Sequence, residues 1–285
     1  MTKNDKVKIS AIIIAKNDEE KIEDCLKSIV WCDEIILIDS GSVDSTTEIA
    51  KKYKAKVYRY EGGSFNNWRN AGLKHARNEW IFYIDTDERV PKELKDEISG
   101  LITNISARAS NITNVNISVN ENTVVFAVPR KNFILGREMK HGGWWPDYVK
   151  RVFKKNALKK WVGDLHEEPV YVGALCHLKN PLIHIKEDNL SDMVEKTNHR
   201  SEIEARLMFD AGHPVMNIPR FFSAAFREFW YRFVVKKAFL DGAEGIIFGI
   251  YQVYSRFISY AKLWEMQNNN IAKVKNKNEF SIKGA

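Results

Sequence analysis

The stretch Ile81-Phe82-Tyr83-Ile84-Asp85-Thr86-Asp87-Glu88 decides the fold, because an apolar run ends there in two carboxylates spaced two residues apart. Such a run is typical of a central strand, buried on both faces of a mostly parallel sheet. Ligands of open α/β sheets bind outside the carboxyl ends of the strands, so Asp85 and Asp87 are expected to face a binding crevice. Two carboxylates suit Mg²⁺ or Mn²⁺, which bind protein carboxylates together with phosphate oxygens. A strand followed by an Asp helix cap would also fit, since Pro91 soon opens a helix.

Short apolar runs alternate with helical periodicity before this stretch. We expect strands at Val7–Ala15, Glu34–Ile38, Lys56–Tyr60 and Glu79–Ile84, with helices at Glu19–Val30, Asp44–Tyr53 and Asn67–Ala76. This alternation indicates βαβ units and a mostly parallel, Rossmann-like sheet in an α/β protein. Later expected elements are a surface loop at Thr103–Asn122, strands at Thr123–Pro129, Val149–Lys154, Pro169–Leu175 and Leu182–Ile185, and a helix at Asn189–Ala211.

Length and composition limit the class of protein. With 285 residues, 44% of them hydrophobic, the chain can form one large domain or one domain with an appendage. Its three cysteines are odd in number and form no C-x-x-C pair, which fits a reducing cytosol and argues against structural zinc. The apolar segment Ile9–Ala15 is too short for a signal peptide, and no uncharged apolar run reaches transmembrane length. The sequence therefore predicts a cytoplasmic protein.

The carboxyl-terminal quarter differs from the rest. Val215–Ala285 contains eleven Lys and Arg against five Asp and Glu, roughly +6 of the net charge of +7. Residues 216–266 are expected to form amphipathic helices with wide aromatic faces, after an α/β domain at 1–215 and before a poorly ordered basic tail at 267–285. Two uses of these helices stay open: peripheral attachment to an anionic membrane surface, or packing against the α/β domain or in a homo-oligomer. Nucleic acid is disfavoured, because no recognised binding motif occurs.

Other polar residues follow the expected strands. Ala15-Lys16-Asn17-Asp18 ends the first strand and Asp39-Ser40-Gly41-Ser42 the second, while Trp68-Arg69-Asn70 lies on the helix before the fourth. These segments are expected to meet at one edge of the sheet. No G-x-G-x-x-G follows the first strand and no G-x-x-x-x-G-K-S/T occurs, which argues against a nicotinamide dinucleotide site and a Walker-type NTPase.

The motifs resemble the family 2 glycosyltransferases, inverting enzymes of the GT-A fold. The segments that carry the resemblance are AIIIAKNDEEKIEDCLKSI, EIILIDSGSVDSTTEIAKKY, NNWRNAGLKHA and WIFYIDTDERVP, all in about the first ninety residues. Weaker similarity continues through GGWWPDYVKRVFKK and LHEEPV. The branch that resembles the chain most adds sugars to lipopolysaccharide cores and related surface glycans. The resemblance makes 1–215 a GT-A catalytic domain.

The resemblance also implies how a nucleotide-sugar would bind. Ala15, Asn17 and Asp18 would lie at the nucleoside, and Asp39 would accept a hydrogen bond from the base, typically uracil. Arg69 would approach the base or the diphosphate. Asp85 would contact the ribose and the metal, and Asp87 would bind the metal directly. Asp39 is followed by Ser40 where many relatives have a second acid.

The catalytic base of an inverting transfer is a carboxylate near the acceptor hydroxyl. Glu167 is the first candidate, because relatives carry a His-Glu pair at this place, and Asp147 is the alternative. Either could instead be a structural partner of Arg151 or Arg137. His184 ends an apolar strand and is a candidate third metal ligand, although such a histidine is more often structural.

The resulting hypothesis is a metal-dependent inverting glycosyltransferase. It would move a sugar from a UDP-sugar to a glycan or lipid-linked acceptor at the inner face of the membrane, in surface polysaccharide or lipopolysaccharide biosynthesis. A nucleotidyltransferase on a related fold is the alternative enzyme, but Ala15-Lys16-Asn17-Asp18 lacks the Gly-rich basic loop expected of one. The alternative outside the enzymes is a basic nucleic-acid-binding or membrane-binding protein.

Overall fold

The computed structural model describes residues 7–109, 122–163, 167–187 and 189–282. Within them the chain forms two compact units: a sheet unit, built from residues up to 132 and from 146–185, and a helical unit, built from 133–145 and from 186 onward. We had expected the α/β domain to reach residue 215. The long helix that follows residue 189 instead groups with the carboxyl-terminal helices, because it packs along them.

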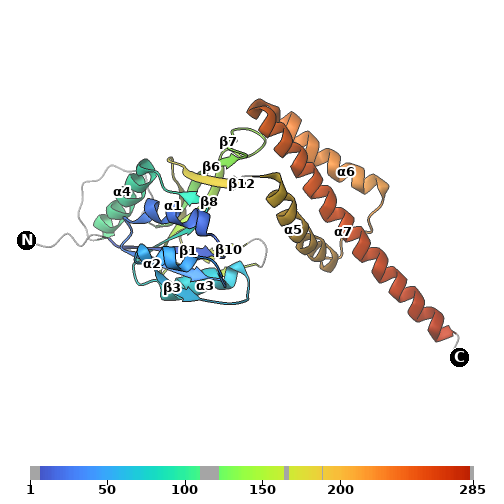
Figure 1. The fold of residues 1–285 in the computed structure, drawn as a ribbon, viewed down its shortest axis with the longest axis horizontal. Helices are drawn as coiled ribbons and strands as arrows, with labels where there is room; N and C mark the ends of the chain where they lie inside the picture. The colour runs from blue at the N-terminus through green and yellow to red at the C-terminus, as the bar shows by residue number, and fades with distance from the viewer. Residues whose placement is uncertain (1–6, 110–121, 164–166, 188, 283–285) are drawn as a thin grey trace, which may run out of the picture. The chain divides into compact units, whose positions relative to one another are not determined.

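The first half of the sheet is parallel, as the sequence predicted (Figure 1). Its strand order is β3 (Lys56–Arg59), β2 (Glu34–Asp39), β1 (Ile9–Ala15) and β4 (Trp80–Asp85). The helices α1 (Glu19–Ile29), α2 (Thr46–Lys52) and α3 (Phe65–His75) connect these strands. In register, Ala15 of β1 lies beside Asp39 of β2, and Ile14 lies beside Asp85 of β4. Polar residues that end two different strands are thereby brought to either side of the end of β1.

Alternate residues of β1 face two different cores, as the period of a strand requires. Ala11 and Ile13 belong to the core that contains Leu26 of α1. Ile12 and Ile14 belong to the core on the side of α3. Gly72 of α3 permits that contact, because a Cβ there would lie 2.4 Å from a methyl carbon of Ile12.

The second half of the sheet is largely antiparallel. After β4 come β8 (Asp147–Lys154), β6 (Thr123–Ile134), β12 (Leu182–Glu187) and β5 (Glu88–Arg89), while β7 (Arg137–Glu138) and β11 (Ala174–His177) pair with β6. A separate hairpin contains β9 (Leu158–Val162) and β10 (Glu168–Tyr171). The expected α/β fold class is confirmed, with a mixed sheet whose parallel half is the Rossmann-like part.

Two expectations about single elements were wrong. The expected loop from Thr103 begins as helix, because α4 (Lys92–Ala109) continues to bury Ile102 and Ile105 in the core. The strand expected at Pro169–Leu175 is two strands, separated at Gly173, whose φ of +136° breaks the ladder. The rest of the expected loop, 110–121, lies outside the described residues.

The helical unit contains α5 (Leu190–Asp210), α6 (Ile218–Phe229), a π-helical segment (Trp230–Val235), a 3₁₀ turn (Ala238–Asp241) and α7 (Gly242–Ile282). Helix α7 packs against both α5 and α6. Ala205, Met216 and Leu263 form a small core, and Phe221 of α6 contacts Phe257 of α7, with ring centroids 5.6 Å apart. No helix in the described part of the chain is long and apolar enough to span a membrane.

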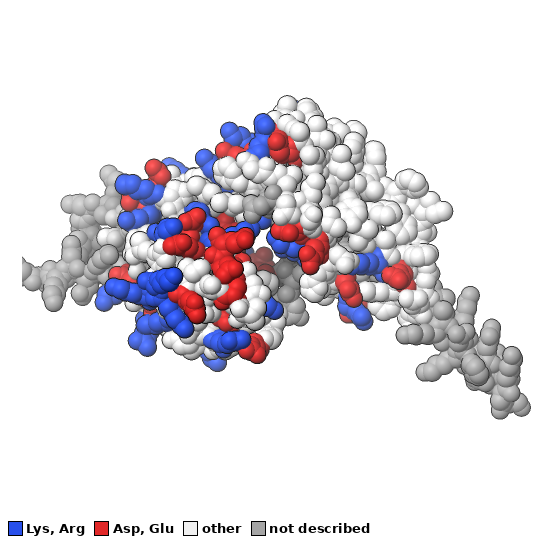
Figure 2. All heavy atoms as spheres, viewed as in Figure 1, with Lys and Arg blue, Asp and Glu red and all other residues white. Residues whose placement is uncertain are grey.

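Helix α6 buries little of its apolar surface. Only Ala224 is buried on it, whereas a stripe of large apolar side chains at helical spacing is exposed: Ile218, Phe222, Phe226, Phe229 and Trp230. We call these five residues the α6 stripe. Figure 2 shows Lys, Arg, Asp and Glu spread widely over the sheet unit, while much of the visible surface of the helical unit carries none of them. The two units thus present different kinds of surface.

Candidate active site

The loops that follow β1 and β2 are tied to each other by hydrogen bonds. The Asn17 N–H donates to Ser42 Oγ (3.0 Å), and Asn17 Oδ1 accepts from the Val43 N–H (2.9 Å). The Asp18 N–H donates to Thr46 Oγ1 (2.8 Å). Asn17 adopts a left-handed conformation with φ of +54°, which Asn tolerates better than most residues. The Ala15 carbonyl oxygen also accepts from the Ser40 N–H (3.0 Å), so Ala15, Asn17 and Asp18, predicted to lie at the nucleoside, are all tied to the segment that follows β2; we call these three residues the rim.

Asp39 is fully buried at the end of β2 and is only half satisfied. Its Oδ1 accepts from the Ser42 N–H at 3.0 Å. Its Oδ2 has no hydrogen-bond partner among the described residues, and Arg59 Nε is 4.0 Å away. An unsatisfied buried acceptor costs about 1–3 kcal/mol. Asp39 Oδ2 can therefore accept from a donor group that the described part of the chain does not supply.

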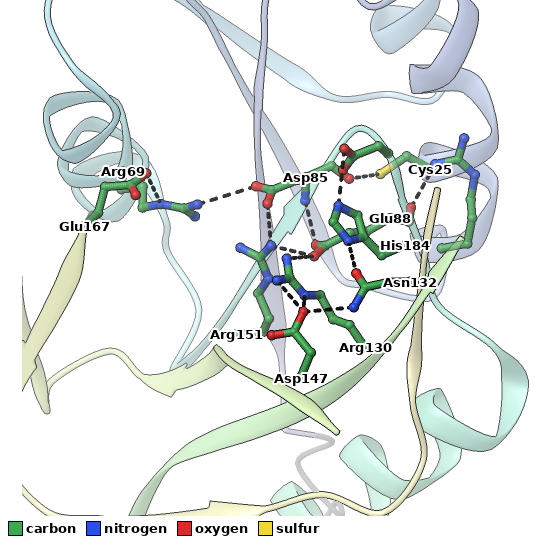
Figure 3. A network of polar contacts seen from close by, with 12 residues as sticks. Cys25, Arg69, Asp85, Glu88, Arg130, Asn132, Asp147, Arg151, Glu167 and His184 are labelled. Atoms are coloured by element: carbon green, nitrogen blue, oxygen red, sulfur yellow. Dashed lines mark hydrogen bonds and ion pairs between the residues drawn. The ribbon is translucent and has the colours of Figure 1, made fainter. Parts of the chain in front are cut away.

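Asp85 lies between two arginines (Figure 3). Its Oδ1 is 3.5 Å from Arg69 Nη2, and its Oδ2 pairs with Arg151. Burial opposes ionisation of this carboxyl, but the charges of Arg151 and Arg69 outweigh burial and hold its pKa well below the usual range. Asp85 is therefore ionised and already neutralised by the protein, which leaves it little free capacity for a cation.

Glu88 and Arg151 are site residues whose roles the sequence did not reveal. Both are buried, and Arg151 bridges Glu88 and Asp85. Burial raises the pKa of Glu88, and the neighbouring Asp85 charge adds to that effect. Glu88 also accepts from the Asp85 N–H (2.9 Å), so it fixes the turn that carries Asp87. The sequence did contain a signal for Glu88, because it is the third acidic residue after the apolar run that ends at Ile84.

Asp87 faces His184 across the end of the sheet. Asp87 Oδ2 is 3.4 Å from His184 Nε2, while the buried Asp87 Oδ1 has no hydrogen-bond partner among the described residues. Strand β12 brings His184 there by pairing with β5, with His184 beside Glu88 in register. Burial and the charge of Asp87 raise the pKa of Asp18, against hydrogen bonds from Lys16 and Thr86 that lower it. An orphaned carboxylate oxygen beside an imidazole nitrogen suits a divalent cation.

This pair does not form a complete metal site. Among the described residues, no group of three or more His, Cys, Asp or Glu side chains has metal-binding geometry. Mg²⁺ commonly takes one or two protein carboxylates and completes its shell with water and substrate phosphates. The residues present therefore fit an ion that arrives with, or is completed by, a phosphate-bearing ligand.

The two candidate bases have different surroundings. Asp147 Oδ2 accepts from Arg130 Nε (3.0 Å), Arg130 Nη2 (2.7 Å) and Asn132 Nδ2 (3.0 Å). Glu167 is half-buried, and its Oε1 is 3.6 Å from Arg69 Nε. Arg69 thereby links Glu167 to Asp85, with its guanidinium 4.8 Å from the Trp161 ring centroid. Arg130 pairs with Asp147 and Arg69 with Glu167, while Arg151 pairs with Asp85 and Glu88.

Trp144 and Trp145 follow Gly143 in a segment that carries part of the family resemblance. Trp144 packs within the helical unit, with its ring centroid 5.0 Å from that of Phe248 and Lys186 Nζ 4.4 Å from it. Trp145 is partly exposed. Packing is therefore the role that the structure gives to Trp144.

Comparison with known proteins gives the class. The profile of glycosyl transferase family 2 matches residues 10–166, more than half of the chain. A glycosyltransferase of Rickettsia bellii is 26% identical over 271 residues, covering 91% of this chain and 87% of the relative. The lipopolysaccharide core biosynthesis glycosyltransferase LpsC of Rhizobium meliloti is 24% identical over 234 residues, covering 78% and 77%.

Solved structures are more distant. S. aureus TarS 1-349 in complex with UDP-GlcNAc is 15% identical, with a TM-score of 0.45 over 93% of this chain and 92% of that one. Glucosyl-3-phosphoglycerate synthase of Mycobacterium tuberculosis, in complex with Mn²⁺ and UDP, is 17% identical, with a TM-score of 0.45 over 73% and 81%.

The match to the family profile and the curated relatives give the reaction class: the protein is a glycosyltransferase. The chain belongs to glycosyl transferase family 2.

Proposed function

We propose that the protein is a metal-dependent, inverting glycosyltransferase that uses a nucleotide-sugar, with UDP as the nucleotide. The observation that carries this proposal is a pair of buried, unsatisfied carboxylate oxygens, Asp39 Oδ2 and Asp87 Oδ1. They end β2 and follow β4, the two strands that flank β1. One can accept from a base N–H and the other can bind a cation, which are the needs of the two ends of a nucleoside diphosphate.

The rim formed by Ala15, Asn17 and Asp18 would hold the nucleoside beside Asp39. Arg69 would approach the diphosphate, as a planar guanidinium suits phosphate oxygens. Asp85 would reach the ribose and the edge of the metal site. Because two arginines already neutralise Asp85, we assign direct cation binding first to Asp87, with His184 as the second protein ligand.

A divalent cation, Mg²⁺ or Mn²⁺, would stabilise the negative charge that develops on the leaving diphosphate. We propose that the Glu167 carboxylate takes the proton of the acceptor hydroxyl. As that oxygen bonds to the anomeric carbon, the bond from this carbon to the diphosphate breaks, and the electron pair leaves with the diphosphate. Glu167 is preferred over Asp147 because three donors already occupy Asp147 Oδ2.

The direct test measures release of nucleoside diphosphate from a panel of UDP-, GDP- and dTDP-sugars, with Mn²⁺ and with chelator. We expect release from a UDP-sugar that depends on the cation. Equal release in chelator would overturn the metal requirement, and release from another nucleotide alone would overturn the assignment of UDP.

For the acceptor we propose a glycan or lipid-linked glycan of surface polysaccharide or lipopolysaccharide biosynthesis. The name of LpsC, a relative over 78% of this chain, supports this class. Incubation with lipid-linked and free oligosaccharide acceptors tests it, because only a true acceptor should speed nucleoside diphosphate release and gain one sugar by mass.

We further propose that the enzyme works as a peripheral protein at the inner face of the cell membrane, bound through the α6 stripe. On a helical wheel the stripe covers one arc, and the exposed Arg220 and Arg227 lie on the next arc, between the stripe and the buried Ala224. Apolar and aromatic side chains flanked by arginines are what an anionic interface accepts. The exposed Lys236 and Lys237 follow the π-helical segment, and each basic residue near an anionic surface contributes about 1 kcal/mol.

Vesicle co-sedimentation tests this attachment. We expect the full chain to bind vesicles that contain anionic lipid at low salt, to bind neutral vesicles weakly, and to lose part of its binding at high salt. If vesicles fail to bind it and the protein sediments as a dimer or larger, the stripe is an oligomer interface and the membrane proposal is wrong.

A further inference from the structure

Three buried or half-buried side chains form a continuous chain of contacts behind Asp87. Asp147 Oδ2 lies 3.0 Å from Asn132 Nδ2, and Asn132 Oδ1 lies 2.6 Å from His184 Nδ1. Figure 3 shows Asn132 standing between the other two. The far nitrogen of His184, Nε2, faces Asp87. Asn132 is fully buried, so water does not compete for either of its contacts.

The chemistry of the three groups allows only one hydrogen-bond direction along this chain. Arg130 binds Asp147 in a two-nitrogen contact, and a carboxylate paired in this way can only accept. The amide NH₂ of Asn132 must therefore face Asp147, and its carbonyl oxygen must face His184. That oxygen can only accept, so His184 Nδ1 must carry a proton. In neutral His184, the lone pair is then on Nε2.

We propose that Asn132, oriented by Asp147, is a positioning residue that fixes His184 in its Nδ1–H tautomer and aims the bare Nε2 at the cation beside Asp87. A bare nitrogen and a carboxylate oxygen 3.4 Å apart cannot hydrogen-bond to each other, but both can bind a cation between them. Metal-binding histidines commonly donate their other N–H to such an acceptor. The consequence for metal binding rests on the proposed function, whereas the tautomer does not.

The tautomer can be measured without metal or donor. In the full chain labelled with ¹⁵N-histidine, at an alkaline pH where imidazoles are neutral, long-range ¹H–¹⁵N spectra distinguish Nδ1–H from Nε2–H. His184→Gln identifies the signal. We expect Nδ1–H in the wild-type chain. Finding Nε2–H there would overturn the proposal, whatever the variants do.

Two substitutions of similar size separate polarity from packing. Asn132→Leu fills the space without an acceptor, so we expect His184 to change to Nε2–H and to donate to Asp87. Asn132→Asp restores an acceptor for Nδ1–H, and if protonated it also donates to Asp147, so we expect it to keep the wild-type tautomer. A purely structural residue would give the same tautomer in both variants, and that result would contradict the proposal.

Cation affinity supplies the second measurement. Loss of a residue that orients a metal-binding histidine typically weakens metal affinity about 10- to 100-fold. We expect Asn132→Leu to weaken Mn²⁺ binding by this factor in calorimetry with UDP present, and Asn132→Asp to weaken it much less. If wild-type His184 is Nδ1–H but Mn²⁺ does not bind, the tautomer assignment stands and the proposed metal dependence fails.

Discussion

The sheet unit buries several charged side chains, whereas the helical unit exposes large apolar side chains. Asp39, Glu88 and Arg151 are each at most 4% exposed, while Ile218 and Phe222 of α6 are more than 70% exposed. Both arrangements depart from the usual distribution, in which charges lie outside and large apolar side chains inside. Each departure costs stability unless something else compensates for it. The buried charges are the basis of the proposed nucleotide-sugar site, and the exposed apolar side chains are the basis of the proposed membrane contact.

The largest effect on activity should come from the carboxylates of the sheet unit. We expect Asp87→Ala to lower nucleoside diphosphate release roughly 10⁴-fold or more, because losing a cation at the leaving group removes several kcal/mol of transition-state stabilisation. Asp24→Ala, on the exposed surface of α1, is the control and should leave the rate unchanged. Thermal unfolding should be similar in both variants. Substantial activity in Asp87→Ala would exclude the proposed metal ligand.

A sharper comparison concerns two neighbouring glutamates. We expect Glu167→Gln to slow transfer by about 10²- to 10⁴-fold with little change in donor affinity, as loss of a general base does. Glu168→Gln is the matched control, because Glu168 points outward and pairs with exposed Lys150 at 2.8 Å. If Asp147→Asn shows the rate loss while Glu167→Gln does not, the base is Asp147. Turnover and UDP binding measured on the same preparations decide between them.

Buried and exposed arginines should differ in stability. Arg151→Met leaves the buried Glu88 and the half-buried Asp85 without their shared cation, and breaking a buried pair costs about 3–5 kcal/mol. Arg137→Met breaks the exposed contact with Glu244 (3.5 Å) and should cost less than about 1 kcal/mol. Urea unfolding at neutral pH measures both, and equal costs would contradict the buried network.

The same network predicts a dependence on pH. The pKa of Asp85 is lower in the folded than in the unfolded chain, so its contribution is present above the unfolded value of about 4 and is lost as pH falls below it. Asp85→Asn should therefore be least stable relative to wild type at neutral pH. The difference between their unfolding free energies should become smaller toward pH 3. The pKa of Glu88 is raised in the folded chain, so its effect on stability has the opposite dependence on pH. The difference in unfolding free energy between wild type and Glu88→Gln should therefore not become smaller as the pH falls.

The smallest effect is expected for the α6 stripe and its neighbouring arginines, and it concerns vesicle binding. Replacing Phe222 and Phe226 together by Ser should weaken binding to anionic vesicles about 10- to 100-fold at both low and high salt, because an apolar contribution is not screened. Replacing Arg220 and Arg227 by Gln should weaken it mainly at low salt. Neither pair should change the rate with a soluble acceptor. If the two double variants show the same dependence on salt, this surface does not combine an apolar contribution with an electrostatic one.

The parallel half of the sheet could be predicted because a strand buried on both faces leaves a continuous apolar run. Ile81–Ile84 and Ile9–Ala15 both have that form, and the acids that end such runs locate the site edge. The antiparallel half could not be predicted fully. Two-residue strands such as β5 carry no periodicity, and α4 passes through an Asn- and Ser-rich segment because Ile102 and Ile105 still face the core.

The candidate site shows the same limit. Asp39, Asp85 and Asp87 stand out because each interrupts or follows an apolar run. Arg151 and Asn132 do not, because their partners are 66 and 52 residues away in the chain. Only the pairing of β8, β6 and β12 brings these side chains together. The roles proposed for the predicted site residues still await the measurements above.

The path of the chain between the units limits how such enzymes can be recombined. The chain passes from one unit to the other after residues 132, 145 and 185, and Asn132, Asp147 and His184 each lie within two residues of one of these points. A hybrid that took its helical unit from a relative would need three splices, each next to a member of the His184 chain of contacts. An exchange of the helical unit would therefore have to preserve Asn132, Asp147 and His184 at the three junctions.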